Sequence, residues 1–259
     1  MSENNSKLKV ELINLEEEQQ SKMDFPLYKI IPYKYLLKWI YADKIRFDKV
    51  AKWDDVYELF LFKQKYIQNG EIIDFKAESE AIYGQSWSME GNSDALWRIY
   101  SPDKLSVQIK TTCEKFIHLL ERSDVFSNQM GAFLGKVRYM EQEQVEDKIR
   151  EYSNDIYSHK NIVDSLYIKR TPFSYEKEIR ILLRKATIEE RNGVNYQCEI
   201  PCFINLDIRP IDLITEVTFD ARLDDNLCSC LKSALQALLP GVQMQKSALG
   251  IFESNTYTI

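Results

Sequence analysis

Two glutamates at the start of a hydrophobic run are the residues of this sequence best suited to chemistry. The segment 173–183 opens with polar residues, carries Glu176 and Glu178, and then becomes apolar apart from Arg180. Alternate residues of an extended chain point to the same side, so the two carboxylates and Arg180 should share one face. Rigid strands often hold working residues where a loop enters them. The alternative is an exposed edge strand whose alternating charges prevent aggregation.

A second polar segment offers groups that suit a flat ring and a phosphate. Ser86 and Ser88 flank Trp87, and a predicted helix a few residues later carries Trp97 and Tyr100. Aromatic faces can enclose a ring, while hydroxyls and a nearby arginine can contact phosphate. Trp97 and Tyr100 also stand three residues apart, the spacing by which a helix packs aromatics into a core. Both interpretations remain open at this stage.

Several common catalytic devices are missing from the sequence. His118 and His159 fall in predicted helices without a partner motif, which does not suit a Ser-His-Asp or Cys-His triad. No glycine-rich phosphate loop occurs. Five cysteines in a chain of 259 residues indicate reduced thiols, and the spacings of Cys198, Cys202, Cys228 and Cys230 do not match a usual zinc knuckle. We therefore predict no metal site.

Asp54 and Asp55, two adjacent acidic residues near the start of the chain, could cap a helix or hold a ligand.

Composition and charge indicate an ordinary folded protein. The chain is 44% hydrophobic and 29% charged, with few glycines and prolines and a formal net charge of −6. An acidic chain is a poor general binder of nucleic acid, although Lys169, Arg170, Arg180, Arg184 and Lys185 could form a local basic patch. No apolar run is long enough to span a bilayer, and residues 1–22 lack the apolar segment of a secretory signal. We expect a cytoplasmic protein.

The periodicity of apolar residues predicts one α+β domain over residues 24–259, preceded by a loosely attached polar leader over residues 1–23. The expected architecture is a mixed, twisted β-sheet flanked by helices. A C-terminal βαβ unit is predicted from two strands around a helix at 224–239, with Leu227, Leu231, Leu235 and Leu238 as its inward stripe. The other expected strands are 27–31, 44–50, 82–89, 105–110, 132–140, 165–169, 178–183 and 196–204, and the other expected helices are 33–43, 95–100, 113–122 and 141–163.

Several of these segments together resemble a large bacterial family, the domain of unknown function DUF2971. The resemblance rests on Leu27-Tyr28-Lys29, the strand 44–47 with the acidic turn 53–58, the segment 93–101 and the segment 175–180, and it covers most of residues 25–250. Two positions depart from the family. Ile31 stands where members often carry an arginine, and the turn reads Asp54-Asp55-Val56-Tyr57-Glu58 where members usually have Asn-Asp-Pro-Phe-Glu.

The layout of this family is similar to that of ADP-ribosyltransferases, which implies a set of roles. Glu178 would be the catalytic carboxylate beside the reacting ribose of NAD, and Glu176 would orient the target. Bound as a substrate, NAD would contact residues along the cleft, with Arg180 or Lys169 on its pyrophosphate. The cofactor-binding residues implied are Tyr28, Ser86, Ser88, Trp97, Tyr100, Lys169 and Arg180.

Three functions follow as hypotheses. The first is an NAD-consuming transferase or glycohydrolase, acting as an effector or toxin in anti-phage defence with a small-molecule nucleotide or protein target and a partner protein from the same system. The second is a non-catalytic sensor that binds a nucleotide or a phage protein. The third is a scaffold that docks through the charged helix at 141–163, a face that solvent alone would also explain. An enzyme requires segments 86–88, 97–100 and 176–178 to converge on one cleft.

Overall fold

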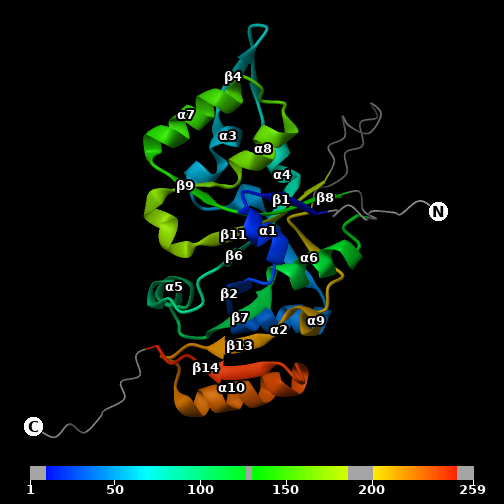
Figure 1. Cartoon of the computed structure of the whole chain (residues 1–259), viewed down its shortest axis with the longest axis vertical. Coiled ribbons are helices and arrows are strands. Elements are labelled where there is room, and N and C mark those ends of the chain that lie inside the picture. The colour runs from blue at the N-terminus through cyan, green and yellow to red at the C-terminus, as the bar shows by residue number, and fades with distance from the viewer. Residues whose placement is uncertain (1–9, 127–129, 186–200, 250–259) are drawn as a thin grey trace, which may run out of the picture.

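The computed structural model describes residues 10–126, 130–185 and 201–249, and within these ranges a large mixed sheet forms the centre of the molecule (Figure 1). Helices cover both of its faces, so the predicted α+β class is confirmed. The described strands of this sheet are β1 (Val10–Ile13), β2 (Pro26–Pro32), β3 (Ile45–Lys49), β6 (Ile82–Ser88), β7 (Ser106–Thr112), β8 (Met130–Lys136), β11 (Glu178–Lys185), β12 (Phe203–Leu206), β13 (Glu216–Phe219) and β14 (Gln243–Lys246).

Shorter elements surround this sheet. Two small sheets pair β4 (Lys65–Gln68) with β5 (Glu71–Asp74) and β9 (Arg138–Met140) with β10 (Ile168–Arg170). The α-helices are α1 (Glu17–Lys22), α2 (Tyr33–Ala42), α3 (Phe60–Lys63), α4 (Lys76–Glu80), α5 (Asp94–Tyr100), α6 (Cys113–Arg122), α7 (Gln142–Ser153), α8 (His159–Ser165), α9 (Pro210–Leu213) and α10 (Asp225–Leu238). The 3-10 helices are η1 (Val50–Lys52), η2 (Val56–Leu59) and η3 (Thr171–Glu176). No described helix combines the length and the apolar character needed to cross a membrane.

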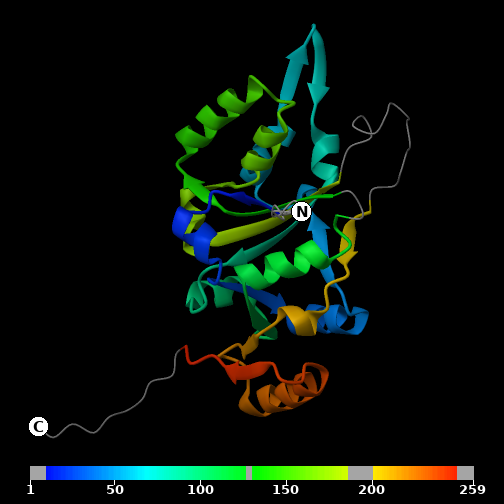
Figure 2. The same ribbon diagram turned by 45° about the vertical axis from the view of Figure 1, so that its right-hand side comes forward.

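Strand β11 runs through the middle of the sheet and separates two hydrophobic cores. The strand order is β1-β8-β11-β6-β2-β7-β13-β14, and β11 is antiparallel to both of its neighbours. Ile179, Ile181 and Leu183 enter the core that contains residues of α2 and α6, whereas Leu182 enters the core that contains residues of α3, α7 and α8. Helices α7 and α8 lie at one end of the long axis and α10 lies at the other, which a turned view also displays (Figure 2).

The sheet opens beside β6. Strand β2 pairs with β6 at one position, Tyr28 opposite Ser88, and β3 pairs with β6 further along, at Gly84 and Tyr83. Between these points the described residues of β6 have no strand partner on that side. A side chain links β6 to β3 in this stretch, because Gln85 Nε2 donates a hydrogen bond to the Arg46 carbonyl at 2.5 Å.

The C-terminal βαβ unit is confirmed, with a different inward face on its helix. Strands β13 and β14 pair in parallel and α10 connects them. The buried residues of α10 are Cys228 and Leu235, whereas Leu227 is 41% exposed and Leu231 is half-buried. The predicted stripe was therefore wrong at Leu227, because the helix is turned so that Cys228 faces the sheet.

The prediction of a loose leader is wrong for residues 10–15, which are paired with or packed against the sheet. Strand β1 pairs in parallel with β8, and Val10 is only 2% exposed. Val10, Leu12 and Ile13 provide the apolar residues of a strand, and α1 follows at once with acidic residues in its first turn. Residues 1–9 lie outside the described part of the chain.

Three other segments differ from expectation. Residues 65–74 lie outside every expected element but form a hairpin, because Asn69 and Gly70 both adopt positive φ values of 53° and 83°, as a tight two-residue turn requires. The predicted long helix over 141–163 divides into α7 and α8, where the Ser158 side chain caps the second helix. Of the predicted strand at 196–204, residues 196–200 lie outside the described ranges, and β12 begins at Phe203.

We predict that Gly135→Ala will detach β1 from the sheet. A Cβ at Gly135 would collide with the backbone carbonyl of Ile13, which cannot move without breaking the β1–β8 pairing. We expect a loss of about 2 kcal/mol in the free energy of unfolding, measured by urea denaturation. The matched control is Gly131→Ala, where the added Cβ would meet the edge of the Phe133 ring at 3.2 Å. Equal stability of the two variants would contradict a fixed β1.

Candidate functional site

The glutamates at the start of β11 lie inside the sheet. Strand β11 has partners on both sides, with Glu178 opposite Ser88 on β6 and Arg180 opposite Ser86. Glu178 is 3% exposed and Arg180 is fully buried. The alternative of an exposed edge strand is therefore wrong, and the shared face predicted for Glu178 and Arg180 is confirmed by their direct contact. The extended chain predicted through Glu176 is wrong, because Glu176 ends η3 and Lys177 adopts a left-handed conformation.

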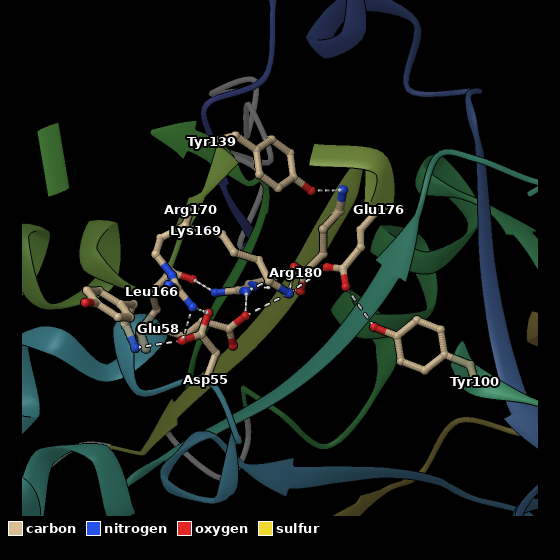
Figure 3. Close-up of polar contacts among 11 residues, drawn as sticks. Asp55, Glu58, Tyr100, Tyr139, Leu166, Lys169, Arg170, Glu176 and Arg180 are labelled. Atoms are coloured by element: carbon tan, nitrogen blue, oxygen red, sulfur yellow. Dashed lines mark hydrogen bonds and ion pairs between the residues drawn. The ribbon is translucent and has the colours of Figure 1, made fainter. Parts of the chain in front are cut away.

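These residues belong to a buried charge cluster, which we define as Glu58, Lys169, Glu176, Glu178 and Arg180 (Figure 3). Lys169 Nζ lies 2.6 Å from Glu176 Oε2, 2.8 Å from Glu58 Oε1 and 3.4 Å from Glu178 Oε2. Arg180 binds Glu178 through Nε at 2.7 Å and Glu58 through Nη2 at 2.9 Å. Three carboxylates thus share two cations, which leaves one negative charge.

Neighbouring elements hold the charge cluster in place. Arg180 Nη1 donates to the Leu166 carbonyl at 2.5 Å, and the backbone N–H of Glu178 donates to the Tyr139 hydroxyl at 2.9 Å. Lys169 comes from β10, and η3 brings Glu176 back beside it. Lys177, with a left-handed φ of 43°, then connects η3 to β11. The short η3 turn therefore sets the approach of Glu176 to Glu178.

The acidic turn supplies Glu58, a residue that the sequence analysis did not single out. Asp55 caps η2 by accepting from the Tyr57 N–H at 2.9 Å, so the capping interpretation is confirmed for Asp55. Asp55 also lies 3.4 Å from Arg170 Nη2. Glu58 sits one turn later and directly before the buried residues Leu59 to Phe62. A carboxylate at the start of such a run was a usable signal for a buried partner.

The charge cluster shifts the pKa values of Glu176 and Glu178 in opposite directions. Burial alone would raise the pKa of Glu178, but Arg180 and Lys169 outweigh it and lower this pKa to about 2. For Glu176, burial raises the pKa above its ordinary value, and the ammonium of Lys169 offsets this only in part. Glu178 is therefore a permanent anion near neutral pH, whereas Glu176 is the carboxylate better placed to exchange a proton.

A cleft of about 740 Å³ lies against the charge cluster, at the opening of the sheet. A volume of this size is typical of small-molecule sites. Segments 86–88, 97–100 and 176–178 all contribute to it, so the convergence required of an enzyme is present. Of the site residues proposed from the sequence, those that line this cleft are Tyr28, Ser86, Ser88, Tyr100, Lys169, Glu176 and Glu178.

Two proposed cofactor-binding residues lie elsewhere. Trp97 is 3% exposed and packs inside the fold, as the core interpretation of this residue held. Arg180 is completely buried, and its guanidinium binds Glu178, Glu58 and the Leu166 carbonyl. It is therefore not available to a pyrophosphate. Lys169 lines the cleft but is likewise engaged by the three carboxylates. Ile31, at the family's usual arginine position, is buried in the core.

Tyr100 connects helix α5 to the charge cluster. Its hydroxyl donates to Glu176 Oε1 at 3.0 Å. The helix starts after Ser93, whose side chain caps it by accepting from the Leu96 N–H. At its other end Arg222, from the C-terminal unit, donates to the carbonyls of Trp97 at 3.0 Å and Ser101 at 2.8 Å.

Arg222 is itself held by a buried carboxylate. Asp220 is almost completely covered, and its Oδ2 lies 2.6 Å from Arg222 Nη2. Arg222 thus latches the last turn of α5 to the loop between β13 and α10. In the described part of the chain, no group of three or more His, Cys, Asp or Glu side chains is arranged to hold a metal ion. Cys198 lies outside the described residues.

Comparison with known proteins supports the family resemblance. The model of the family described as "Protein of unknown function (DUF2971)" matches residues 96–181, a stretch that includes most of α5, all of β10 and the first residues of β11. This match confirms the resemblance over that stretch. No curated protein matches the chain.

Three solved structures of DarT from Thermus sp. 2.9 are also similar in layout. The complex with NAD+ has a TM-score of 0.37 and 11% identity, and the match covers 86% of this chain and 96% of that one. The complex with ADP-ribosylated ssDNA has a TM-score of 0.37, 10% identity and coverages of 86% and 93%. The complex with carba-NAD+ has a TM-score of 0.36, 11% identity and coverages of 86% and 95%. The similarity is too distant to assign a role to any residue of this chain.

We predict that the free energy of unfolding falls at acidic pH because Glu178 becomes protonated. Its pKa in the folded state, about 2, lies below the ordinary value of 4.5, so its contribution is present above the ordinary pKa and is lost as the pH falls toward 2. We expect this group to account for about 3 kcal/mol of the fall in unfolding free energy between pH 5 and pH 2. Urea denaturation of the wild type and of Glu178→Gln measures the difference. Parallel curves for the two proteins would contradict it.

Proposed function

We propose that the protein cleaves the nicotinamide–ribose bond of NAD, either as an ADP-ribosyltransferase or as an NAD glycohydrolase. The observation that carries this proposal is the joining of Tyr28, Ser86 and Tyr100 with the paired carboxylates Glu176 and Glu178 in one cleft. NAD carries a cationic nicotinamide ring and an anionic diphosphate. The cleft has both kinds of charge on its walls. The carboxylates of the charge cluster suit the cationic nicotinamide ring, and Lys29, Lys52 and Arg170 suit the anionic diphosphate.

The proposed reaction uses the two glutamates differently. As the C1′–N bond breaks, its electron pair goes to the nicotinamide nitrogen and positive charge develops on the ribose. The permanent anion at Glu178 stabilises this charge, because a fixed carboxylate in a buried site needs no reorganisation. A hydroxyl of the target, or water, then attacks C1′, and Glu176 accepts its proton. Tyr100 holds Glu176 in position through its hydrogen bond.

A second candidate is a nucleotide-binding sensor without catalysis. One observation favours it: Arg180 donates to both Oε1 and Oε2 of Glu178, at 2.7 and 3.0 Å, so this carboxylate is already engaged. Such a protein would bind NAD or another nucleotide in the same cleft and leave it intact. The experiment below separates the two candidates.

We expect Glu178→Gln to reduce NAD turnover at least about 100-fold, because it removes the charge beside the reacting ribose. Labelled NAD is incubated with the purified protein, with and without bacterial lysate, and free nicotinamide and labelled macromolecules are counted. Glu151→Gln on the exposed face of α7 is the matched control, and circular dichroism checks the fold of each variant. Glu178→Asp, which keeps the charge, should retain part of the activity.

The same assay decides between the hypotheses. NAD that binds the wild type and survives intact supports the sensor and contradicts the enzyme. NAD that neither binds nor reacts contradicts both. As an effector or toxin, the wild type should slow the growth of a bacterial host on expression, and Glu178→Gln should not.

Tyr100→Phe tests the role of Glu176. The Tyr100 hydroxyl stabilises the ionised form of Glu176, so its removal raises the pKa of Glu176 further. We expect the acid limb of the rate profile to move to higher pH in this variant, with the rate on the alkaline plateau reduced much less than at low pH. The measurement is kcat/KM for NAD between pH 5 and pH 9. An unmoved acid limb would show that Glu176 does not carry the proton.

A further inference from the structure

A lysine amine lies in the cleft at the point where the sheet opens. Lys29 and Ser86 both line the cleft, and Lys29 Nζ donates a hydrogen bond to the Ser86 carbonyl at 2.8 Å. Ser86 belongs to the stretch of β6 between its pairings with β2 and β3. The amine therefore bonds a carbonyl that a strand N–H would meet in a continuous sheet, and Lys29 is one of the residues that line the cleft.

The surroundings of Lys29 contrast with those of Lys169. Three carboxylates lie within ion-pair distance of Lys169 and hold it as a cation. The described ion pairs include none with Lys29, and Glu178 on β11 and Asp48 on β3 act on it only at longer range. Ser86 supplies a neutral carbonyl on the side of β6. Lys29 is thus a half-buried amine with no ion-pair partner among the described residues.

Such an amine is partly neutral under ordinary conditions. Burial lowers the pKa of Lys29 to about 8, against an ordinary value of 10.5, with Glu178 and Asp48 opposing the shift. At pH 7 roughly a tenth of the amine is then neutral, about 300 times the neutral fraction of an unperturbed lysine. The neutral amine is the nucleophilic form.

We propose that Lys29 is a carbonyl-reactive amine that forms an imine with a phosphate-bearing aldehyde in the cleft. The amine nitrogen attacks the aldehyde carbon, the carbonyl oxygen leaves as water after proton transfers, and a C=N bond replaces the C=O bond without oxidation or reduction. Lys52 and Arg170, which also line the cleft, provide positive charge for the phosphate. Open-chain sugar phosphates belong to this class of ligand.

The test uses pyridoxal 5′-phosphate as the probe on the full chain at pH 7, followed by borohydride reduction and peptide mapping by mass spectrometry. We expect Lys29 to be labelled at least about 10-fold faster than any other lysine, including Lys52 in the same cleft. Lys29→Arg keeps the charge and should abolish this fast labelling, while circular dichroism shows an unchanged fold. Lys52→Arg should leave Lys29 as the fastest site.

Two further arms sharpen the result. Labelling of Lys29 should rise from pH 6 and level off above about pH 8, whereas labelling of an exposed lysine should continue to rise toward pH 10. Pyridoxal without its phosphate should react more slowly with Lys29. Labelling spread evenly over the lysines, or equal rates at Lys29 and Lys52, would overturn the proposal.

This inference stands apart from the proposed NAD chemistry. Glu178→Gln retains Lys29 and the opening of the sheet, so it should still be labelled at Lys29 first. A protein that reacts with pyridoxal 5′-phosphate and leaves NAD intact would keep this inference and lose the proposed function. A protein that turns over NAD without preferential labelling would do the reverse.

Discussion

The structure depends on the ion pairs among five charged side chains buried at the start of β11, in which three carboxylates share two cations. Each of them would be costly to bury alone, because the interior solvates charge poorly. Together they are tolerated, since every carboxylate of the cluster contacts Lys169 or Arg180 and the guanidinium also reaches a backbone carbonyl. Such a cluster has to form as a unit, because removing one partner leaves an unpaired charge behind. It brings η2, β10, η3 and β11 to one place.

The opening of the sheet gives this cluster access to a ligand. A continuous sheet would fill the space beside β6 with backbone, but β2 and β3 pair with β6 at different points along its length. The cleft occupies this region, with the anionic carboxylates and several cations on its walls. Its polarity thus suits a ligand that has both charges, and the proposed reaction and the proposed reactivity of Lys29 share this opening and its cations.

The sequence predicted the elements better than their arrangement. Local signals placed β2, α2, β6, α5, α6 and β11 close to their observed bounds. Glu176 and Glu178 do lie close together, but η3 and the left-handed Lys177 bring them together rather than the predicted extended chain. Partners that come from distant segments were not found, because no local pattern connects Glu58 or Tyr139 to β11. The same limit explains Arg180, whose charge suggested a ligand contact although burial commits it to carboxylates.

Burial also explains why the outer segments were misjudged. The polar composition of residues 1–23 concealed a four-residue strand whose few apolar side chains are enough to fix it to β8. A helical pattern in α10 was recognised, but its rotation about its axis was not, since several of its residues are apolar or small and periodicity alone does not choose between Leu227 and Cys228.

The latch formed by Arg222 has a consequence for the order in which the molecule matures. Tyr100, Lys169, Glu176 and Glu178 are all present once about two thirds of the chain has been made, yet the residue that fastens the last turn of α5 is encoded some forty positions later. A chain that is still being synthesised would therefore carry the cleft-lining residues before Arg222 is available to fasten the last turn of α5. This contact between α5 and the C-terminal unit is among the last to form.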